Sequence, residues 1–225
     1  MFQAIFYKEW VKSRNVVILL GVIAIALVAH SLLMTTHLFR NDGAVSAWIS
    51  VSQGEVPAIS TVVKSFFLVS AIALSVIQYT SEMVNKRFKL TLHLPKSENF
   101  LFTALLLYGV LVLSVIYTAM TAMLMGVMAY YYPQEILIHT LLDLIPQMLI
   151  GFAAYFFIAW VVIEPIWKRR LAALLVSLAT LEAFVVTGRG IGTLLYSIPY
   201  LFLIVIIAVA CAFYSASRFK DGAQD

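Results

Sequence analysis

Charged residues are scarce in this chain of 225 residues, which carries 11 acidic and 15 basic side chains. They make up 12% of the sequence, whereas 63% of it is hydrophobic. The mean hydropathy is +0.98. A soluble domain of this size needs far more polar surface, so the composition argues against that class. It predicts a protein that lies within a lipid bilayer.

Cysteine is nearly absent as well, since Cys211 is the only one. The sequence therefore offers neither a disulfide framework nor a pair of thiols for a metal. The nucleotide-binding pattern G-x-x-x-x-G-K-[ST] is also missing, and the polar residues are dispersed rather than clustered as in an enzyme. We expect no catalytic site, metal or cofactor in this chain. Any ATP and its Mg²⁺ would be bound by a partner.

Hydrophobic runs, by contrast, are long and numerous. Crossing the hydrocarbon takes roughly 20 apolar residues per helix. Six stretches qualify, at about residues 16–36, 62–80, 100–129, 138–163, 171–187 and 193–215. Pro146 divides the fourth stretch, which predicts an interfacial or re-entrant piece over 135–145 and the crossing itself over 147–163. We therefore predict an all-α polytopic membrane protein with six transmembrane helices, folded as a single domain over residues 1–225.

The basic residues predict the orientation of these helices, because cytoplasmic loops are enriched in lysine and arginine. With both termini in the cytoplasm, only Arg40, Lys64 and Arg189 lie outside. The cytoplasmic cations are then Lys8, Lys12, Arg14, Lys86, Arg87, Lys89, Lys96, Lys168, Arg169, Arg170, Arg218 and Lys220. The net charge of +4 follows from this asymmetry and does not indicate nucleic-acid binding. A bacterial cytoplasmic (inner) membrane is the expected location.

The first residues combine apolar and basic side chains at helical spacing. Within residues 1–15, Phe2, Ile5, Phe6 and Trp10 recur on one side, and Lys8, Lys12 and Arg14 lie beside them. This pattern predicts an amphipathic helix in the membrane interface. An ordinary basic flank of the first span is the alternative.

The longest polar interruption is Ser81 to Phe100, and it is both basic and apolar. Cations place it in the cytoplasm. The segment also contains several large apolar side chains, which is typical of a segment that contacts a partner protein. The residues that give it this character are Glu82, Lys86, Arg87, Phe88, Lys89, Leu90, Leu92, Leu94, Pro95 and Lys96. A topology signal whose leucines lie among lipid headgroups is the alternative.

With these residues the chain resembles permeases of the type-2 ABC exporter family. Their second cytoplasmic segment commonly reads Glu, charged residues, Gly-Thr, alternating leucines, Leu-Pro and Ser. The matching residues here are Glu82, Leu90, Leu92, Leu94, Pro95 and Ser97, with Lys86 and Arg87 in place of Gly-Thr. The likeness extends over the whole chain in size, in six-span topology and in the amphipathic N-terminal helix. The motif itself covers about 20 residues.

The resemblance implies that residues 81–99 form a cytoplasmic coupling segment, which inserts into a groove of a soluble ATPase. Phe88, Leu90 and Leu92 would supply the docking surface, and the cations beside them would meet charges on the ATPase. Two ATPase copies and a second permease would complete the transporter. A homodimer is expected, and a similar permease is the other option. The very apolar spans favour a hydrophobic or amphipathic cargo.

Polar residues within the spans are candidates for function, because a charge there costs about 2.5–3.5 kcal/mol on insertion scales. His139, Asp143 and Glu182 are the candidates for a transport path. Glu164 is expected to pair with Lys168 or Arg169. If the acidic residues carry protons, the chain is an ion-coupled secondary transporter that needs no ATPase. A membrane assembly factor for cofactor maturation is a further alternative.

Small residues recur every four positions in the third span, at Thr118, Ala122 and Gly126. This spacing lets another helix approach closely. It therefore predicts a packing surface on that helix.

Overall fold

The computed structural model describes residues 2–41, 43–52, 61–83, 98–187 and 195–220. Helices account for every regular element in these ranges. They are α1 (Phe2–Asn41), α2 (Gly43–Ser52), α3 (Thr61–Met83), α5 (Glu98–Tyr131), α6 (Gln134–Ile163), α7 (Trp167–Thr187), the 3₁₀ turn η2 (Leu195–Ser197) and α8 (Ile198–Lys220). The prediction of an all-α protein is confirmed for the described residues.

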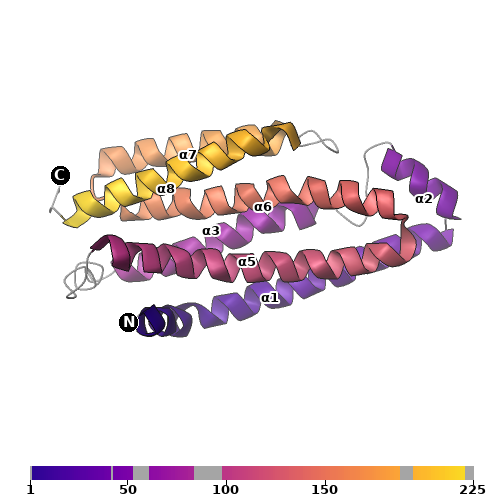
Figure 1. Cartoon of the computed structure of the whole chain (residues 1–225), viewed down its shortest axis with the longest axis horizontal. Coiled ribbons are helices and arrows are strands. Elements are labelled where there is room, and N and C mark those ends of the chain that lie inside the picture. Colours follow the sequence, from indigo (N-terminus) through magenta and orange to yellow (C-terminus); the bar gives the residue numbers. More distant parts are fainter. Residues whose placement is uncertain (1, 42, 53–60, 84–97, 188–194, 221–225) are drawn as a thin grey trace.

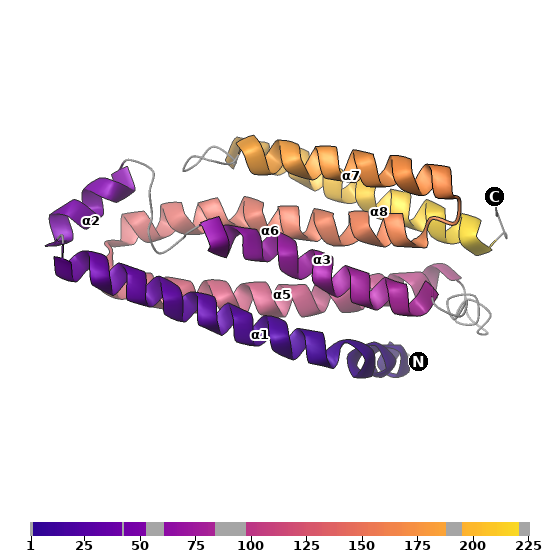
Figure 2. The same ribbon diagram turned by 180° about the vertical axis from the view of Figure 1, so that it is seen from behind.

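The six longer helices lie side by side and alternate in direction along the chain (Figure 1). Both chain termini lie at one end of the bundle, which we call the terminal end. The view from behind gives the same arrangement (Figure 2). The short helix α2 lies at the opposite end, which we call the α2 end. An even number of antiparallel helices brings the two termini together in this way.

Five of these helices are long and apolar enough to cross a membrane, namely α1, α3, α5, α6 and α8. The fold is thus compatible with a multi-pass membrane protein. Helix α7 begins with the cations Lys168, Arg169 and Arg170, so its purely apolar part is shorter than the full helix of 21 residues. Its crossing of the membrane stays a prediction.

The prediction for Pro146 is wrong in one respect. Helix α6 runs without interruption from Gln134 to Ile163 and contains Pro146 in its interior. The ring removes one backbone hydrogen bond, but such a loss is tolerated where neighbouring helices pack around the site. Pro146 is buried, in keeping with that packing. Residues 135–145 are therefore the first turns of α6 and not a separate re-entrant piece.

The expected interfacial helix over residues 1–15 is also part of a longer element, since α1 is one helix of 40 residues. Figure 1 shows its first turns nearly end-on, so they run across the direction of the remaining turns. Two aromatic contacts join these turns to α5, from Phe2 to Phe100 and from Phe6 to Tyr108, with ring centroids 4.6 and 5.6 Å apart. Ile5 is buried, whereas Phe2 and Trp10 are 39% and 43% exposed. The position of this segment in the membrane interface stays a prediction.

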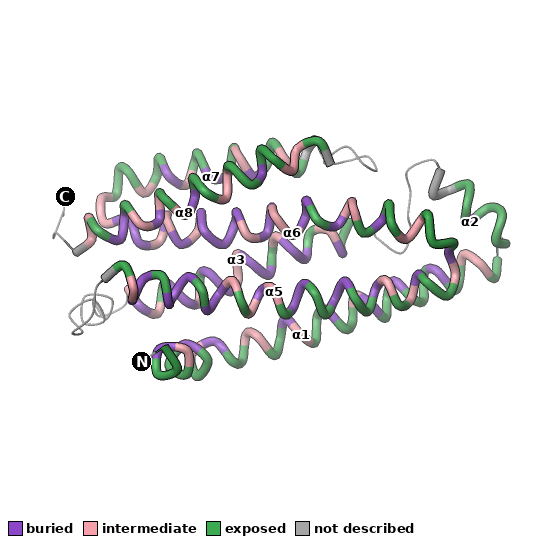
Figure 3. The backbone as a smooth tube through the Cα atoms, in the orientation of Figure 1, coloured by how far each residue is buried: buried purple, intermediate pink, exposed green. Residues whose placement is uncertain are grey.

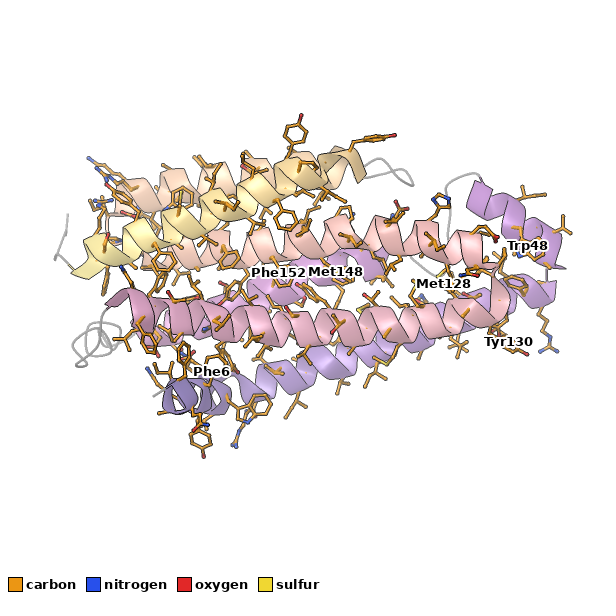
Figure 4. All side chains as sticks on the ribbon, in the orientation of Figure 1. Phe6, Trp48, Met128, Tyr130, Met148 and Phe152 are labelled. Atoms are coloured by element: carbon orange, nitrogen blue, oxygen red, sulfur yellow. The ribbon has the colours of Figure 1, made fainter. Side chains whose placement is uncertain are left out.

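The core of the bundle lies where α3, α5 and α6 meet. Tyr117 of α5 donates a hydrogen bond to the backbone oxygen of Phe67 at 2.5 Å, and its ring packs against Phe67 and Phe152. A Cβ atom added to Gly151 would lie 2.8 Å from that same Phe67 oxygen. Glycine at position 151 therefore permits the close approach of α6 to α3. Figure 4 shows the Phe152 side chain in the middle of the bundle.

Buried residues face this core, and the outward faces of the helices are exposed (Figure 3). Many of the exposed side chains are large and apolar. On α1, α7 and α8 they include Ile18, Leu19, Val22, Leu175, Leu178, Phe202, Leu203 and Ile206. A surface this apolar is unfavourable in water and is typical of helices that face lipid tails.

The small-residue stripe of α5 does not serve packing within the chain. Thr118, Ala122 and Gly126 are all exposed, and nothing lies within 4 Å of a Cβ atom added to Gly126. The glycines that permit close approach are instead Gly109 and Gly151. The stripe is left on the outside of the described bundle.

Candidate functional site: a buried polar cluster at the terminal end

Two buried glutamates and two less buried lysines form a cluster at the terminal end of the bundle, between α1 and the last turn of α3. Its members are Lys8, Glu9, Lys12 and Glu82. Glu82 is the first residue of the predicted docking set, and it is 2% exposed. The rest of that set, from Lys86 to Pro95, lies outside the described residues. The cluster is therefore the described structure closest in sequence to the predicted coupling segment.

Glu82 is held by two lysines from α1. Its Oε1 atom lies 2.9 Å from Lys8 Nζ and 3.0 Å from Lys12 Nζ. Lys12 also donates to the backbone oxygen of Gln78, one turn earlier on α3, at 3.0 Å. These contacts span about 70 residues of sequence and fix the first turns of α1 to the end of α3.

Glu9 lies deeper in the same cluster and is fully buried. Lys12 Nζ lies 2.9 Å from its Oε1 atom and 2.8 Å from its Oε2 atom, but only the contact with Oε1 has hydrogen-bond geometry. The Oε2 atom has no hydrogen-bond partner. Two carboxylates therefore share Lys12, and one of them keeps a free oxygen.

The surroundings shift the pKa values of the two carboxyl groups in opposite directions. Both lie beyond the apolar stretches 16–36 and 62–80 that we assign to the hydrocarbon. Burial raises the pKa of Glu9, and the nearby charge of Lys12 only partly offsets this effect. Burial also acts to raise the pKa of Glu82, but hydrogen bonds and charges from Lys8 and Lys12 outweigh it, so the pKa falls below its ordinary value. Of the two, Glu82 keeps its charge to the lower pH.

A chain of hydrogen bonds continues from the cluster into the bundle. Gln78 donates to the backbone oxygen of Leu105 on α5 at 2.9 Å and accepts from Tyr155 of α6 at 2.9 Å. The hydroxyls of Tyr155 and Tyr79 also lie 2.9 Å apart. Polar groups buried in an apolar bundle are stabilising only when they are paired, and these are. The network links α3, α5 and α6 just inside the ion pairs.

Gly109 of α5 makes room for this network. A Cβ atom added there would lie 2.1 Å from the Tyr155 hydroxyl. Closer to the ion pairs, the hydroxyls of Ser13 and Tyr108 lie 2.6 Å apart and join α1 to α5. Polar side chains therefore connect α1, α3, α5 and α6.

A second ion pair joins the other helices at the same end. Glu164, which follows the last residue of α6, lies 2.8 Å from Arg218 of α8 and accepts a hydrogen bond from Ser215. Arg170 of α7 donates to the backbone oxygen of Glu164 at 2.7 Å. The expected pairing of Glu164 with Lys168 or Arg169 is thus wrong, because among the described residues Glu164 forms its ion pair with Arg218. The partner comes from a helix distant in sequence.

The three candidates for a transport path lie toward the α2 end. His139 and Asp143 are one turn apart on α6, where His139 is exposed and Asp143 is half-buried. Glu182 is exposed on α7. None of the three belongs to the polar cluster, and nothing in their placement assigns them a role.

The cations are segregated between the two ends of the bundle. Among the described side chains, those near the terminal end are Lys8, Lys12, Arg14, Lys168, Arg169, Arg170 and Arg218. Arg40 and Lys64 lie toward the α2 end. The distribution agrees with the sequence pattern that predicted the topology.

Comparisons were made with family models, with curated proteins and with solved structures. None of the three found a match. The chemistry of the site must therefore be judged from its own geometry. Its lysines and carboxylates are already paired with one another, and the described residues contain no group of histidine, cysteine and acidic side chains able to hold a metal ion. The cluster joins the first turns of α1 to the last turn of α3, and the adjoining hydrogen bonds extend to α5 and α6.

The raised pKa of Glu9 leads to a prediction for the substitution Glu9→Gln. A raised pKa means that the folded state favours neutral Glu9, so stability is lost as the pH rises from the ordinary glutamate value of 4.5 through the raised pKa. We expect Glu9→Gln to remove that loss, so that its melting temperature relative to the wild type rises from pH 4.5 up to the raised pKa of Glu9 and stays constant above it, as measured between about pH 4.5 and pH 8.

Melting curves in detergent over this pH range test the prediction. Glu135→Gln is a matched control, because Glu135 is exposed at the α2 end. A constant difference between Glu9→Gln and the wild type at all pH values would show that Glu9 does not titrate in this way.

Proposed function

We propose that this chain is the membrane permease subunit of an ATP-driven transporter whose ATPase is a separate protein. The observation that supports the proposal most directly is the pair of salt bridges that Lys8 and Lys12 form with Glu82. Glu82 lies at the end of α3, where the chain leads into the segment that we expect to contact the ATPase. A push on that segment would reach α1, α5 and α6 through the polar cluster.

The segment itself has the chemistry of a docking surface. Burying Phe88, Leu90 and Leu92 would contribute roughly 1.5–3 kcal/mol each before the cost of association. The cations Lys86, Arg87 and Lys89 would steer an acidic partner and fix its register. Because the chain itself lacks a phosphate-binding motif, the partner would supply ATP, Mg²⁺ and hydrolysis.

In this proposal α7 is a sixth crossing, and the terminal end faces the cytoplasm. The excess of cations there supports this orientation under the positive-inside rule. Two ATPase copies would then bind beneath two permease copies, in a homodimer or with a similar permease, in a bacterial inner membrane. The membrane-spanning helices are very apolar, which suits a hydrophobic or amphipathic cargo that passes between the two permease copies.

The alternatives have less support. An ion-coupled transporter would use Asp143 and Glu182 as proton carriers inside the bundle, whereas Glu182 is exposed and Asp143 is only half-buried. No observation favours a role in cofactor assembly over transport.

The double substitution Leu90→Asp and Leu92→Asp tests the docking surface. A charge in place of each leucine cannot be buried against a partner, so we expect co-purification of the ATPase to fall by at least tenfold. The measurement is the ratio of ATPase to permease after affinity purification from membranes that contain both.

Thr91→Asp with His93→Asp provides a matched control. It adds the same charges at the alternate positions of the leucine pattern and should leave co-purification nearly unchanged. Full recovery of the ATPase with the leucine variant, or an equal loss with both variants, would contradict the proposed docking surface.

A further inference from the structure

A cavity of about 510 Å³ opens between α3, α6 and α7, on the α2 side of the bundle. Thr61, Ser65 and Val185 are exposed around it, whereas Gln147 and Ile150 are buried. The cavity is therefore open to the surface and has a buried floor. Its full lining is Thr61, Lys64, Ser65, Leu68, Gln147, Ile150 and Val185. It is separate from the polar cluster at the terminal end.

The floor of the cavity carries an unpaired amide. Gln147 is 9% exposed, and its side chain makes no hydrogen bond with any described residue, although it could make several. The amide atoms of Gln147 are not among the fully buried, unpaired side-chain atoms of the described residues, so they are accessible from the cavity. The other buried glutamine of the bundle, Gln78, has partners for both ends of its amide. Gln147 thus presents a donor and an acceptor to whatever fills the cavity.

The cavity also carries one positive charge. Lys64 is half-buried, and no ion pair joins it to a carboxylate in the described part of the chain. It lies in the first turn of α3, where the helix dipole adds further positive potential. Leu68, Ile150 and Val185 make the rest of the lining apolar. A cation, an amide and an apolar wall therefore meet at the same opening.

We propose that this cavity binds an amphiphile with a single negative charge on its head group, such as a fatty acid or the phosphodiester of an anionic lipid. The head group accepts hydrogen bonds from Lys64 and from the Gln147 amide. The hydrocarbon chain lies along Leu68, Ile150 and Val185 and leaves through the open side. The site does not depend on the proposed transport activity.

The charge of the lining explains why the head group carries one negative charge and not several. Lys64 is the only charged side chain in the described lining. One lysine is matched by one negative charge on the head group.

The test uses the whole protein in nanodiscs of zwitterionic lipid. The probe is a fluorescent fatty acid, which is compared with its methyl ester and with a trimethylammonium analogue of the same chain. Competition by nanodiscs that contain phosphatidylglycerol, and by acetate and inorganic phosphate, identifies the source of the head group. The variants are Lys64→Gln, Gln147→Leu and Val185→Trp, and Arg40→Gln is the matched control because Arg40 is an exposed cation toward the same end.

We expect the fatty acid to bind at least about tenfold more tightly than the ester or the cationic analogue. Lys64→Gln should weaken binding by about tenfold and Gln147→Leu by about threefold, and Val185→Trp should block the cavity. Arg40→Gln should stay within about twofold of the wild type. Competition by phosphatidylglycerol would identify the site as one for membrane lipid, and its absence as one for free fatty acid.

Three results would overturn the proposal. They are equal binding of the acid and its ester, unchanged binding by Lys64→Gln and Val185→Trp, or displacement of the probe by acetate or phosphate alone. Size-exclusion chromatography of each variant verifies that it remains folded, and Val185→Trp tests the cavity even if Gln147→Leu is unstable.

Discussion

Replacing Glu82 with alanine should destabilise the protein by about 3 kcal/mol, because the change leaves Lys12 and Lys8 without their shared carboxylate. Removing one partner of a buried ion pair costs about 3–5 kcal/mol. We take the lower end of this energy range for Glu82→Ala, because the Lys8 side chain is 46% exposed and water can solvate it. For a chain of this length, a loss of this size lowers the melting temperature by roughly 6–12 °C.

A double-mutant cycle separates the ion pair from other effects of the substitution. Lys12→Met, Glu82→Ala and the combined variant are compared by thermal unfolding in detergent. We expect the double variant to be more stable than the sum of the single losses predicts, by about 1 kcal/mol or more. Strict additivity would show that Lys12 and Glu82 do not interact. Glu135→Gln, an exposed change, should be neutral.

Under the proposed function, Glu82→Ala also distinguishes a role of Glu82 in stability from a role in coupling ATP hydrolysis to transport. Glu82→Ala leaves the leucines of the docking segment intact, so the ATPase should still co-purify. Transport should fall more than ATP hydrolysis, because the link between the segment and α1 is lost. Equal losses of transport and hydrolysis would assign Glu82 to stability alone.

Gly151→Ala should disrupt the packing of α6 on α3. The added Cβ atom would lie 2.8 Å from the backbone oxygen of Phe67 and 2.6 Å from the Tyr117 hydroxyl. A backbone atom cannot move aside as a flexible side chain can, so the helices must separate. Overpacking of this kind costs about 1–3 kcal/mol, and Gly151→Val should cost more. The measurement is thermal unfolding together with the yield of monodisperse protein.

Gly21→Ala is the matched control for this prediction. Nothing lies within 4 Å of a Cβ atom added to Gly21 of α1. The change should be neutral or stabilising, by up to about 1 kcal/mol, because alanine favours the helix. If Gly151→Ala were equally well tolerated, α6 and α3 would not approach as closely as described.

Much of the fold could be predicted from local patterns, because apolar runs of sufficient length specify helices in a bilayer. The exact elements were harder to predict. Pro146 suggested a break, but the surrounding helices of the bundle support an unbroken α6. Residues 1–15 suggested a separate helix, but they form the first turns of α1 and contact α5 through Phe2 and Phe6. Their position in the membrane interface stays a prediction.

The polar cluster likewise depends on contacts between segments distant in sequence, which local patterns do not predict. Glu82 was among the predicted residues through its place in the motif, but Glu9 was not, although it is the more deeply buried of the two. Its only signal in the sequence is an acidic residue among apolar and basic ones in an amphipathic segment. The pairing of Lys12 with Glu82 spans 70 residues and has no local pattern. Gln147 and Lys64 likewise become notable only when α3 and α6 are placed together.

The central claim is that the segment between α3 and α5 contacts a soluble ATPase, and crosslinking tests it most directly. A photo-reactive amino acid at Leu90 is activated in native membranes, and a second variant carries it at Tyr130, which is 84% exposed at the α2 end. We predict that Leu90, and not Tyr130, forms a covalent adduct with a protein whose peptides contain the G-x-x-x-x-G-K-[ST] motif. Adducts of Leu90 with lipid or with the chain itself, and none with a nucleotide-binding protein, would contradict the account.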